Sequence, residues 1–240
     1  MPQTLKKHVT SGWQAVLLDL DGTLLDTLPD LAGAANAMRQ DLGLNTLPAT
    51  EIGTYIGKGV DLLVARALAG NIEASTTGGE AFERARQIFY SHYETLNGQL
   101  ATFYPGVLEG LHAIQTMGIP MGVVTNKPTQ FALPLLERTG LAPFMQTVVC
   151  GDSCEQRKPD PAPVFLACRQ LGCDPQLTLT IGDSVNDALA ARAAGCKVLA
   201  VPYGYNEGNP VTALEVDGIV ESIQEAAFWL LNNQPQLISN

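Results

Sequence analysis

Four aspartates stand at or just beyond the points where buried strands are expected to end. Asp19 and Asp21 follow the apolar run that ends at Leu18. Asp183 closes a later apolar run, and Asp187 follows it by one helical turn. The carboxyl ends of parallel strands meet at one edge of a sheet, so these side chains are expected to converge. Several neighbouring carboxylates cannot all stay ionised without a cation, and a few hard oxygen ligands suit Mg²⁺. The pattern therefore predicts a magnesium site with an open face.

The spacing of Asp19 and Asp21 allows the two carboxylates different tasks. Residues two apart share a face of a strand, but Gly22 and Thr23 follow at once and favour a turn. One carboxylate can then attack a substrate while the other moves protons. Metal coordination holds the first ionised, and the second, better shielded from the cation, carries a proton near neutral pH. A carboxylate that attacks phosphorus forms an aspartyl-phosphate, a known mode of covalent catalysis.

Two further polar positions are suited to binding a phosphoryl group. Thr125 and Asn126 end a predicted strand, where a hydroxyl and free backbone N–H groups can bind oxygen anions. Lys158 precedes Pro159, at the start of a predicted helix, and offers a point charge for a phosphate and for the nucleophile. A turn-forming role is the alternative for Asn126, and a solvated surface position is the alternative for Lys158.

Two of these segments also fit a purely structural role at the start of a helix. Ser184-x-x-Asp187 has the spacing of a capping box, with Asp in place of Glu, and Asp favours a helix start in any case. Both roles are compatible for Asp187, and we favour a place in the metal site. Thr27-x-x-Asp30 has the same spacing, and there we expect helix capping alone.

Short apolar runs alternate with amphipathic stretches along most of the chain. Such alternation is typical of a doubly wound, Rossmann-like α/β fold with a parallel sheet. The predicted strands are Trp13–Asp19, Ile119–Asn126, Thr147–Gly151, Leu177–Asp183 and Lys197–Tyr203. The predicted helices between them are Gly106–Met117, Thr129–Thr139, Pro161–Leu171 and Ser184–Ala194. The tail from Asn232 to Asn240 is expected to be mobile.

One connection is far too long for this pattern. The stretch between Asp19 and Thr125 is more than three times the ~30 residues of a strand–helix–strand unit. The excess reads as helical, with helices over 28–42, 60–69 and 80–96. We therefore predict a core formed by residues 1–26 and 100–240, and a helical cap domain formed by residues 27–99. The inserted segment follows the first strand, so it should cover the edge where open α/β sheets bind ligands.

The composition of this 240-residue chain limits the classes of partner that it is expected to bind. It carries 14 Lys+Arg against 24 Asp+Glu, a net charge of -10, so a basic face for nucleic acid is not expected. No apolar run approaches the ~18 residues of a membrane span, and we expect a cytoplasmic protein with no membrane partner. Cys150 and Cys154 have no second Cys or His pair nearby, which argues against a zinc site. A small phosphorylated metabolite remains the expected partner, for a monomer or a homodimer.

Taken in order, the four polar segments resemble the motifs of a known family, the haloacid-dehalogenase-like phosphatases. Asp19-Leu20-Asp21-Gly22-Thr23-Leu24-Leu25-Asp26-Thr27 resembles the first motif; Thr125-Asn126, Lys158 and Gly182-Asp183-Ser184-Val185-Asn186-Asp187 resemble the second, third and fourth. The resemblance implies that Asp19 is the nucleophile and Asp21 the general acid and base. It also implies that Thr125 and Lys158 orient and neutralise the phosphoryl group.

The same resemblance implies a metal site and a place for the inserted helices. Mg²⁺ would be held by Asp19, by the main-chain carbonyl of Asp21 and by Asp183, with Asp187 in support. Residues 27–99 would be a cap of the type that this family places between its first two motifs.

A narrower resemblance is to the bacterial phosphoglycolate phosphatases. It is carried by residues 26–31, 55–60, 124–128 and 203–206, and it implies 2-phosphoglycolate as the substrate. Gly57, Lys58 and Gly59 precede a predicted helix, where N–H groups attract anions and Lys58 adds charge. We expect this loop to bind the carboxylate of the substrate. A turn for the glycines and a surface position for Lys58 are the alternatives.

Three other functions fit parts of the pattern. A phosphatase of a hexose or N-acetylmuramate 6-phosphate would share the whole core and differ in the cap. A phosphosugar mutase would share both aspartates but return the phosphoryl group to its substrate. A non-enzymatic binding protein would have no need of both Asp19 and Asp21.

Overall fold

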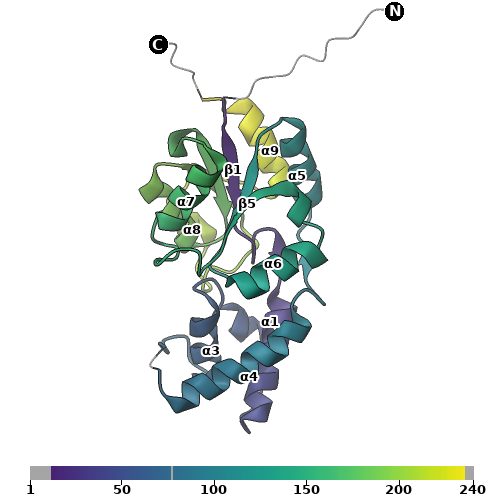
Figure 1. Cartoon of the computed structure of the whole chain (residues 1–240), viewed down its shortest axis with the longest axis vertical. Helices are drawn as coiled ribbons and strands as arrows, with labels where there is room; N and C mark the ends of the chain where they lie inside the picture. Colours follow the sequence, from purple (N-terminus) through teal and green to yellow (C-terminus); the bar gives the residue numbers. More distant parts are fainter. Residues whose placement is uncertain (1–11, 77, 236–240) are drawn as a thin grey trace, which may run out of the picture.

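The computed structural model describes residues 12–76 and 78–235 and is built around a parallel sheet (Figure 1). Six strands lie in the order β5-β4-β1-β6-β7-β8, and every neighbouring pair is parallel. The strands are β1 Ala15–Leu18, β4 Met121–Val124, β5 Met145–Val149, β6 Thr178–Gly182, β7 Lys197–Ala200 and β8 Gly218–Ile219. The ends of the predicted core and tail, residues 1–11 and 236–240, lie outside the described residues.

Both faces of this sheet are covered, which confirms the predicted α/β class. Val16 and Leu18 point into an apolar cluster shared with α5, α6 and α9, whereas Leu17 points into one shared with α7 and α8. All three side chains are fully buried, as expected for strands that are apolar on both faces. The helices are α5 Val107–Thr116, α6 Thr129–Arg138, α7 Ala162–Leu171, α8 Val185–Ala194 and α9 Ile223–Asn232.

The central strands end at one edge of the sheet. Leu18 of β1 pairs in register with Val123 of β4 and with Ile181 of β6. The loops that follow these strands therefore begin side by side, and two of them carry Asp19 and Asp183. The geometry of parallel pairing thus brings together residues that are far apart in the sequence.

Residues 27–99, which we call the helical insertion, form a separate group of helices beyond that edge (Figure 1). They pack around their own apolar cluster, which includes Met38 and Phe89. Phe131 and Tyr205 extend this cluster from the sheet layers, by which we mean the six-stranded sheet with the helices and loops that surround it. Among the described residues, no helix combines the length and the apolar character needed to cross a membrane. The insertion contains α1 Leu28–Asp41, α2 Ala49–Gly53, α3 Val60–Ala69 and α4 Glu80–Leu96.

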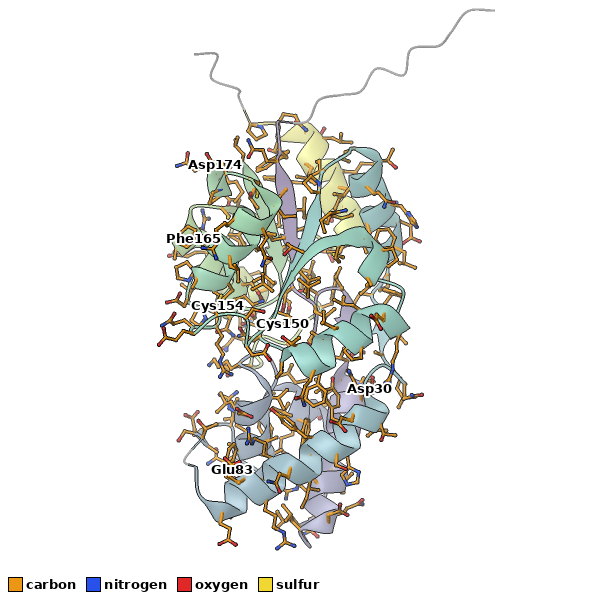
Figure 2. The ribbon with its side chains drawn as sticks, viewed as in Figure 1. Asp30, Glu83, Cys150, Cys154, Phe165 and Asp174 are labelled. Atoms are coloured by element: carbon orange, nitrogen blue, oxygen red, sulfur yellow. The ribbon has the colours of Figure 1, made fainter. Side chains whose placement is uncertain are left out.

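A short two-stranded ribbon closes the root of the insertion. The strands β2 (Leu25–Asp26) and β3 (Thr102–Phe103) are antiparallel, so the chain leaves and returns at one place. Asp30 lies beside this root, at the junction with the sheet layers (Figure 2). It is buried, and it accepts hydrogen bonds from the backbone N–H groups of Gly98 and Leu100 at 2.8 Å and of Ala101 at 3.2 Å.

The capping role predicted for the Thr27 and Asp30 pair is therefore wrong. The side chain of Thr27 makes no capping hydrogen bond to α1. Its hydroxyl instead donates to Asp21 Oδ1 at 2.7 Å, and Asp30 holds the returning chain. The sequence spacing matched a local motif, but both side chains bind partners outside the helix.

Replacing Asp30 with Ala should destabilise the protein by about 3 kcal/mol, because three N–H groups at the root lose a charged acceptor. Asp30→Asn keeps one acceptor oxygen and should lose roughly half as much. Urea denaturation gives both values. Asp41→Ala is the matched control on the same helix, because Asp41 is half exposed and pairs only with His92; we expect a change within about 0.5 kcal/mol. An equal loss for Asp30→Ala and Asp41→Ala would contradict the role given to Asp30.

Candidate active site

The chain makes a tight turn directly after β1. Asp19 N still donates to Ile181 O at 2.9 Å, which continues the pairing with β6. The N–H groups of Leu24 and Leu25 then both donate to Leu20 O, at 3.0 and 3.1 Å. The turn needs glycine at position 22, where φ is +89° and a Cβ atom would lie 2.6 Å from Asp183 Oδ2. The turn directs Asp19 and Asp21 to different partners.

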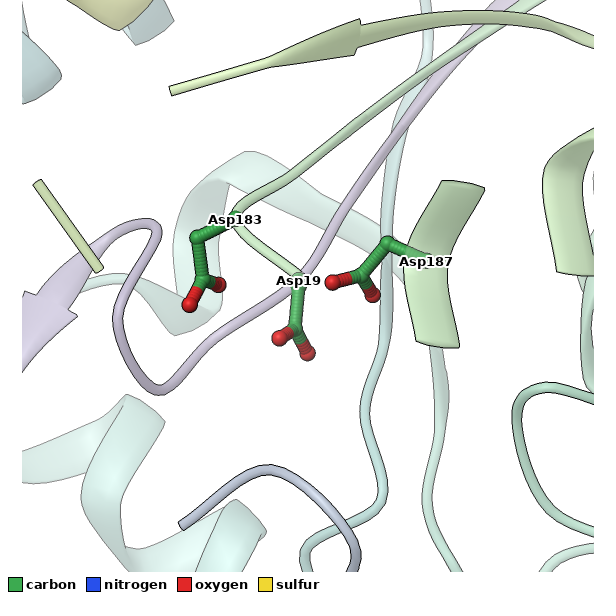
Figure 3. Close-up of side chains that lie close together, drawn as sticks. All are labelled: Asp19, Asp183 and Asp187. Carbon is green, nitrogen blue, oxygen red and sulfur yellow. The ribbon is translucent and has the colours of Figure 1, made fainter. Parts of the chain in front are cut away.

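Asp19 belongs to a cluster of three carboxylates. Ligand oxygens of Asp19, Asp183 and Asp187 all lie within 4.8 Å of one another (Figure 3). Burial and the negative charge of Asp187 raise the pKa of Asp19 to about 7, although the neighbouring ammonium of Lys158 opposes the shift. Burial, with the charges of Asp187 and Asp19, also raises the pKa of Asp183 well above its ordinary value. The cluster therefore holds more negative charge than its surroundings compensate.

Lys158 supplies the one ammonium that touches this cluster in the described part of the chain. Its Nζ donates to Asp19 Oδ1 at 2.8 Å, to Asp187 Oδ1 at 2.6 Å and to Val124 O at 2.6 Å. All three N–H donors are thus used, which fixes a side chain that is only 4% exposed. Burial disfavours its charge, but the two carboxylates outweigh that cost and raise the pKa of Lys158.

The other partners of the cluster are hydrogen-bond donors without a positive charge. Thr23 Oγ1 donates to Asp183 Oδ1 at 2.7 Å, and Tyr205 N donates to Asp183 Oδ2 at 2.6 Å. Asp187 Oδ2 accepts from Ser184 N and Ser184 Oγ, at 3.1 and 2.6 Å, so the predicted capping box is present. Its other oxygen faces Lys158, so Asp187 has the predicted capping role and also lies in the carboxylate cluster. Buried carboxylate oxygens with excess negative charge fit a small, hard divalent cation.

Asp21 lies apart from this cluster and has a cation of its own. Asp21 Oδ1 accepts a hydrogen bond from Thr27 Oγ1 at 2.7 Å and from Lys127 Nζ at 2.8 Å. Lys127 also donates to the phenol oxygen of Tyr93, on α4 of the insertion, at 2.6 Å. Thr27, Lys127 and Tyr93 were not predicted as parts of the site. The available signals were that Thr27 and Lys127 lie in segments that carry the family resemblance and that Lys127 directly follows Thr125 and Asn126.

A cavity of about 40 Å³ lies between the edge of the sheet and the insertion. From the sheet layers it is lined by Asp19, Asp21, Thr125, Asn126 and Lys127. From the insertion it is lined by Leu31, Ile56, Gly57, Gly59, Val60 and Leu63. Predicted residues from both parts of the chain thus meet around one cavity.

Asn126 joins the two sides of the cavity. Its Nδ2 donates to Gly57 O and to Lys158 O, both at 3.0 Å, and Asn186 Nδ2 also donates to Gly57 O at 3.3 Å. The loop of the insertion is therefore held against the sheet through the backbone of Gly57. The buried Oδ1 of Asn126 has no hydrogen-bond partner among the described residues and remains available to a ligand.

The ammonium of Lys58 pairs with an acidic side chain, whereas we expected it to face the substrate. It is paired with Glu207 Oε2 at 2.7 Å, and Arg66 of α3 holds the other oxygen of Glu207, also at 2.7 Å. Lys58 is absent from the cavity lining, whereas its neighbours Gly57 and Gly59 are part of it. The ion pair with Glu207 explains the difference, because an acidic side chain distant in the sequence already binds the ammonium.

Comparisons with known proteins agree with this geometry. A family model described as haloacid dehalogenase-like hydrolase matches residues 16–201. A phosphoglycolate phosphatase of Thiobacillus denitrificans is 47% identical over 217 residues, which cover 90% of this chain and 95% of that protein. The phosphoglycolate phosphatase of Nitrosospira multiformis is also 47% identical, over 213 residues that cover 89% and 93%.

A solved structure shows the same arrangement of the chain. The crystal structure of a predicted phosphoglycolate phosphatase from Haemophilus somnus matches with a TM-score of 0.85 and 32% identity. The match covers 91% of this chain and 98% of that one. Four polar segments meet at one edge of a parallel sheet, and the family model spans all of them. The chain therefore belongs to the haloacid dehalogenase-like hydrolase family.

Proposed function

We propose that this protein hydrolyses a small phosphomonoester through an aspartyl-phosphate on Asp19, and that its preferred substrate is 2-phosphoglycolate. The observation that carries the proposal is the pairing of two aspartates at one cavity with separate buried cations, Lys158 for Asp19 and Lys127 for Asp21. A nucleophile and a proton-transfer group need such different environments. The relatives named above as phosphoglycolate phosphatases support the choice of substrate.

The first half of the reaction transfers the phosphoryl group to Asp19. A carboxylate oxygen of Asp19 attacks phosphorus in line, and the bond from phosphorus to the ester oxygen breaks. Asp21 gives its proton to that leaving oxygen, so the alcohol departs neutral. Lys158 and Thr125 stabilise the negative charge on the phosphoryl oxygens that do not react.

The second half returns the site to its starting state. Asp21, now ionised, takes a proton from a water molecule, which attacks phosphorus and breaks its bond to the Asp19 oxygen. Inorganic phosphate leaves, and Asp21 again holds a proton. Mg²⁺, held by Asp19, Asp183 and the main-chain carbonyl of Asp21 with Asp187 in support, would supply positive charge to the phosphoryl oxygens.

The cavity favours a short substrate with two anionic ends. Four aliphatic side chains of the insertion line one side of it, and charged groups of the sheet layers line the other. Helix α3 begins at Val60, and its first N–H groups have no side-chain cap. Because Gly59, Val60 and Leu63 line the cavity, we expect these N–H groups to bind the carboxylate of the substrate. In this proposal, residues 27–99 act as a cap, Gly57 and Gly59 contact the substrate, and Lys58 tethers their loop.

Asp19→Asn should lower kcat for phosphate release from 2-phosphoglycolate by roughly a thousandfold or more, because the amide cannot act as the nucleophile. The assay is release of inorganic phosphate with Mg²⁺, run beside glucose 6-phosphate and N-acetylmuramate 6-phosphate. We expect the wild-type protein to show the highest kcat/KM for 2-phosphoglycolate. A higher kcat/KM for a sugar phosphate would agree with the proposed mechanism and contradict 2-phosphoglycolate as the preferred substrate. Isomerised sugar phosphate without phosphate release would indicate a mutase.

Mg²⁺ should stabilise the protein against heat, and more strongly at alkaline than at acidic pH. Asp19 has a pKa of about 7 in the folded protein and 3.8 in a free chain, so the folded state binds its proton more tightly between those values. Raising the pH through that window therefore lowers the stability of the metal-free protein. Mg²⁺ competes with the same proton, so it should add about 3 kcal/mol at a hundredfold excess over its Kd near pH 8, and much less near pH 5.5.

The measurement is thermal denaturation with and without Mg²⁺ at the two pH values. Asp183→Asn serves as the control, because it removes a proposed ligand while keeping the shape of the side chain. This variant should lose most of the Mg²⁺ effect. Equal stabilisation at both pH values would show that protons and Mg²⁺ do not share Asp19.

Lys58→Met and Glu207→Gln should both impair the enzyme, because the first removes one of the two ion pairs that tether the insertion to Glu207 and the second weakens both. We expect both to lower kcat/KM for 2-phosphoglycolate by about three- to tenfold and to keep its preference over ethyl phosphate, which lacks the carboxylate. The comparison is a ratio of kcat/KM values for the two esters. Loss of that ratio in Lys58→Met alone would place the ammonium on the substrate instead.

A further inference from the structure

The carboxyl group of Asp21 is held by one of its two oxygens. Oδ1 accepts from Thr27 Oγ1 at 2.7 Å and from Lys127 Nζ at 2.8 Å. Within residues 12–76 and 78–235, nothing donates to the other oxygen, Oδ2. Because Oδ1 already receives two hydrogens, a proton carried by this carboxyl group belongs on Oδ2. Asp21 lines the cavity, so the proton would be presented from a fixed side chain.

Lys127 is held in turn by the helical insertion. Its side chain is only 2% exposed, and the second partner of its Nζ is the phenol oxygen of Tyr93 at 2.6 Å. The ammonium also lies 4.9 Å from the centre of the Tyr93 ring. A buried ammonium needs such partners, and here one belongs to the β1 loop and the other to α4.

The position of Tyr93 depends on how α4 packs on the sheet layers. Tyr93 is fully buried, and its ring lies edge-on to Phe131 of α6 with 4.8 Å between the centres. Asn97, just beyond α4, donates to Phe131 O at 2.8 Å. A continuous set of contacts thus connects α4, Tyr93, Lys127 and Asp21.

From these contacts we infer that Lys127 is a positioning residue for Asp21 and that Tyr93 is its anchor on the insertion. The packing of α4 against α6 then determines where Asp21 Oδ2 points, so proton delivery to the leaving oxygen requires the insertion in place. This inference rests on the proposed function, because it concerns the step in which Asp21 protonates that oxygen.

The test compares leaving groups that differ in their need for a proton. The alkoxide leaving from 2-phosphoglycolate must be protonated, whereas p-nitrophenolate from p-nitrophenyl phosphate leaves unaided. Lys127→Met keeps most of the side chain, and Tyr93→Phe removes a single oxygen atom. The quantity to measure is the single-turnover rate of leaving-group release with Mg²⁺, which isolates phosphorylation of Asp19 from later hydrolysis.

Lys127→Met should slow glycolate release about a hundredfold and p-nitrophenolate release less than about fivefold, since general-acid catalysis contributes roughly 10²–10⁴-fold. Tyr93→Phe should slow glycolate release about tenfold and leave p-nitrophenolate release nearly unchanged. Lys127→Arg should release glycolate faster than Lys127→Met does, because it keeps the positive charge. Thermal denaturation of each variant checks that it is folded.

Three results would decide against the inference or its premise. An equal fall in both rates would show that Lys127 supports the site as a whole, and it would overturn the positioning role. A rise in KM for both esters with unchanged single-turnover rates would make Lys127 a phosphate-binding group, which also overturns it. A wild-type protein that released neither leaving group would refute the proposed function itself, so the two failures are distinguishable.

Discussion

The ammonium of Lys158 is the contact on which the rest of the site depends. It binds carboxylates from two separate strand ends and a carbonyl from a third, and it is almost completely buried. Without it, three carboxylates would crowd one edge of the sheet with no fixed positive charge. With it, one oxygen of Asp19 accepts a hydrogen bond, and part of the negative charge of the cluster is still uncompensated. That imbalance fits the divalent cation and the phosphoryl group of the proposed reaction.

The residues that the sequence predicted best are those whose positions follow from the sheet. Asp19, Thr125 and Asp183 each follow a buried apolar run, and parallel pairing leaves little freedom in where such residues lie. Asp187 was also found, because it lies one helical turn beyond a strand end. Most strands and helices of the core were predicted for the same reason, since periodic apolar positions identify them, but β8 and α9 were not predicted.

The residues that were missed or assigned differently are those that bind partners far along the chain. Asp30 matched a capping motif, yet its partners are backbone groups near residue 100. Lys58 looked free, yet Glu207 binds it. Lys127 carries no motif of its own, and its role becomes visible only when α4 places Tyr93 beside it. Spacing within a short window cannot report such contacts, because they depend on how the insertion packs against the sheet layers. The short elements β2, β3, β8 and α2 were missed because two to five residues show no period.

The narrow root of the insertion has a consequence for how this protein can change over evolution. The chain departs at Asp26 and returns at Thr102, and these two residues are paired in the β2–β3 ribbon. A segment whose ends meet can be lengthened, shortened or exchanged without moving the strands that hold Asp19 and Asp183. A new insertion on the same ribbon would therefore change the side chains that line one side of the cavity and leave the carboxylate cluster at the edge of the sheet unchanged.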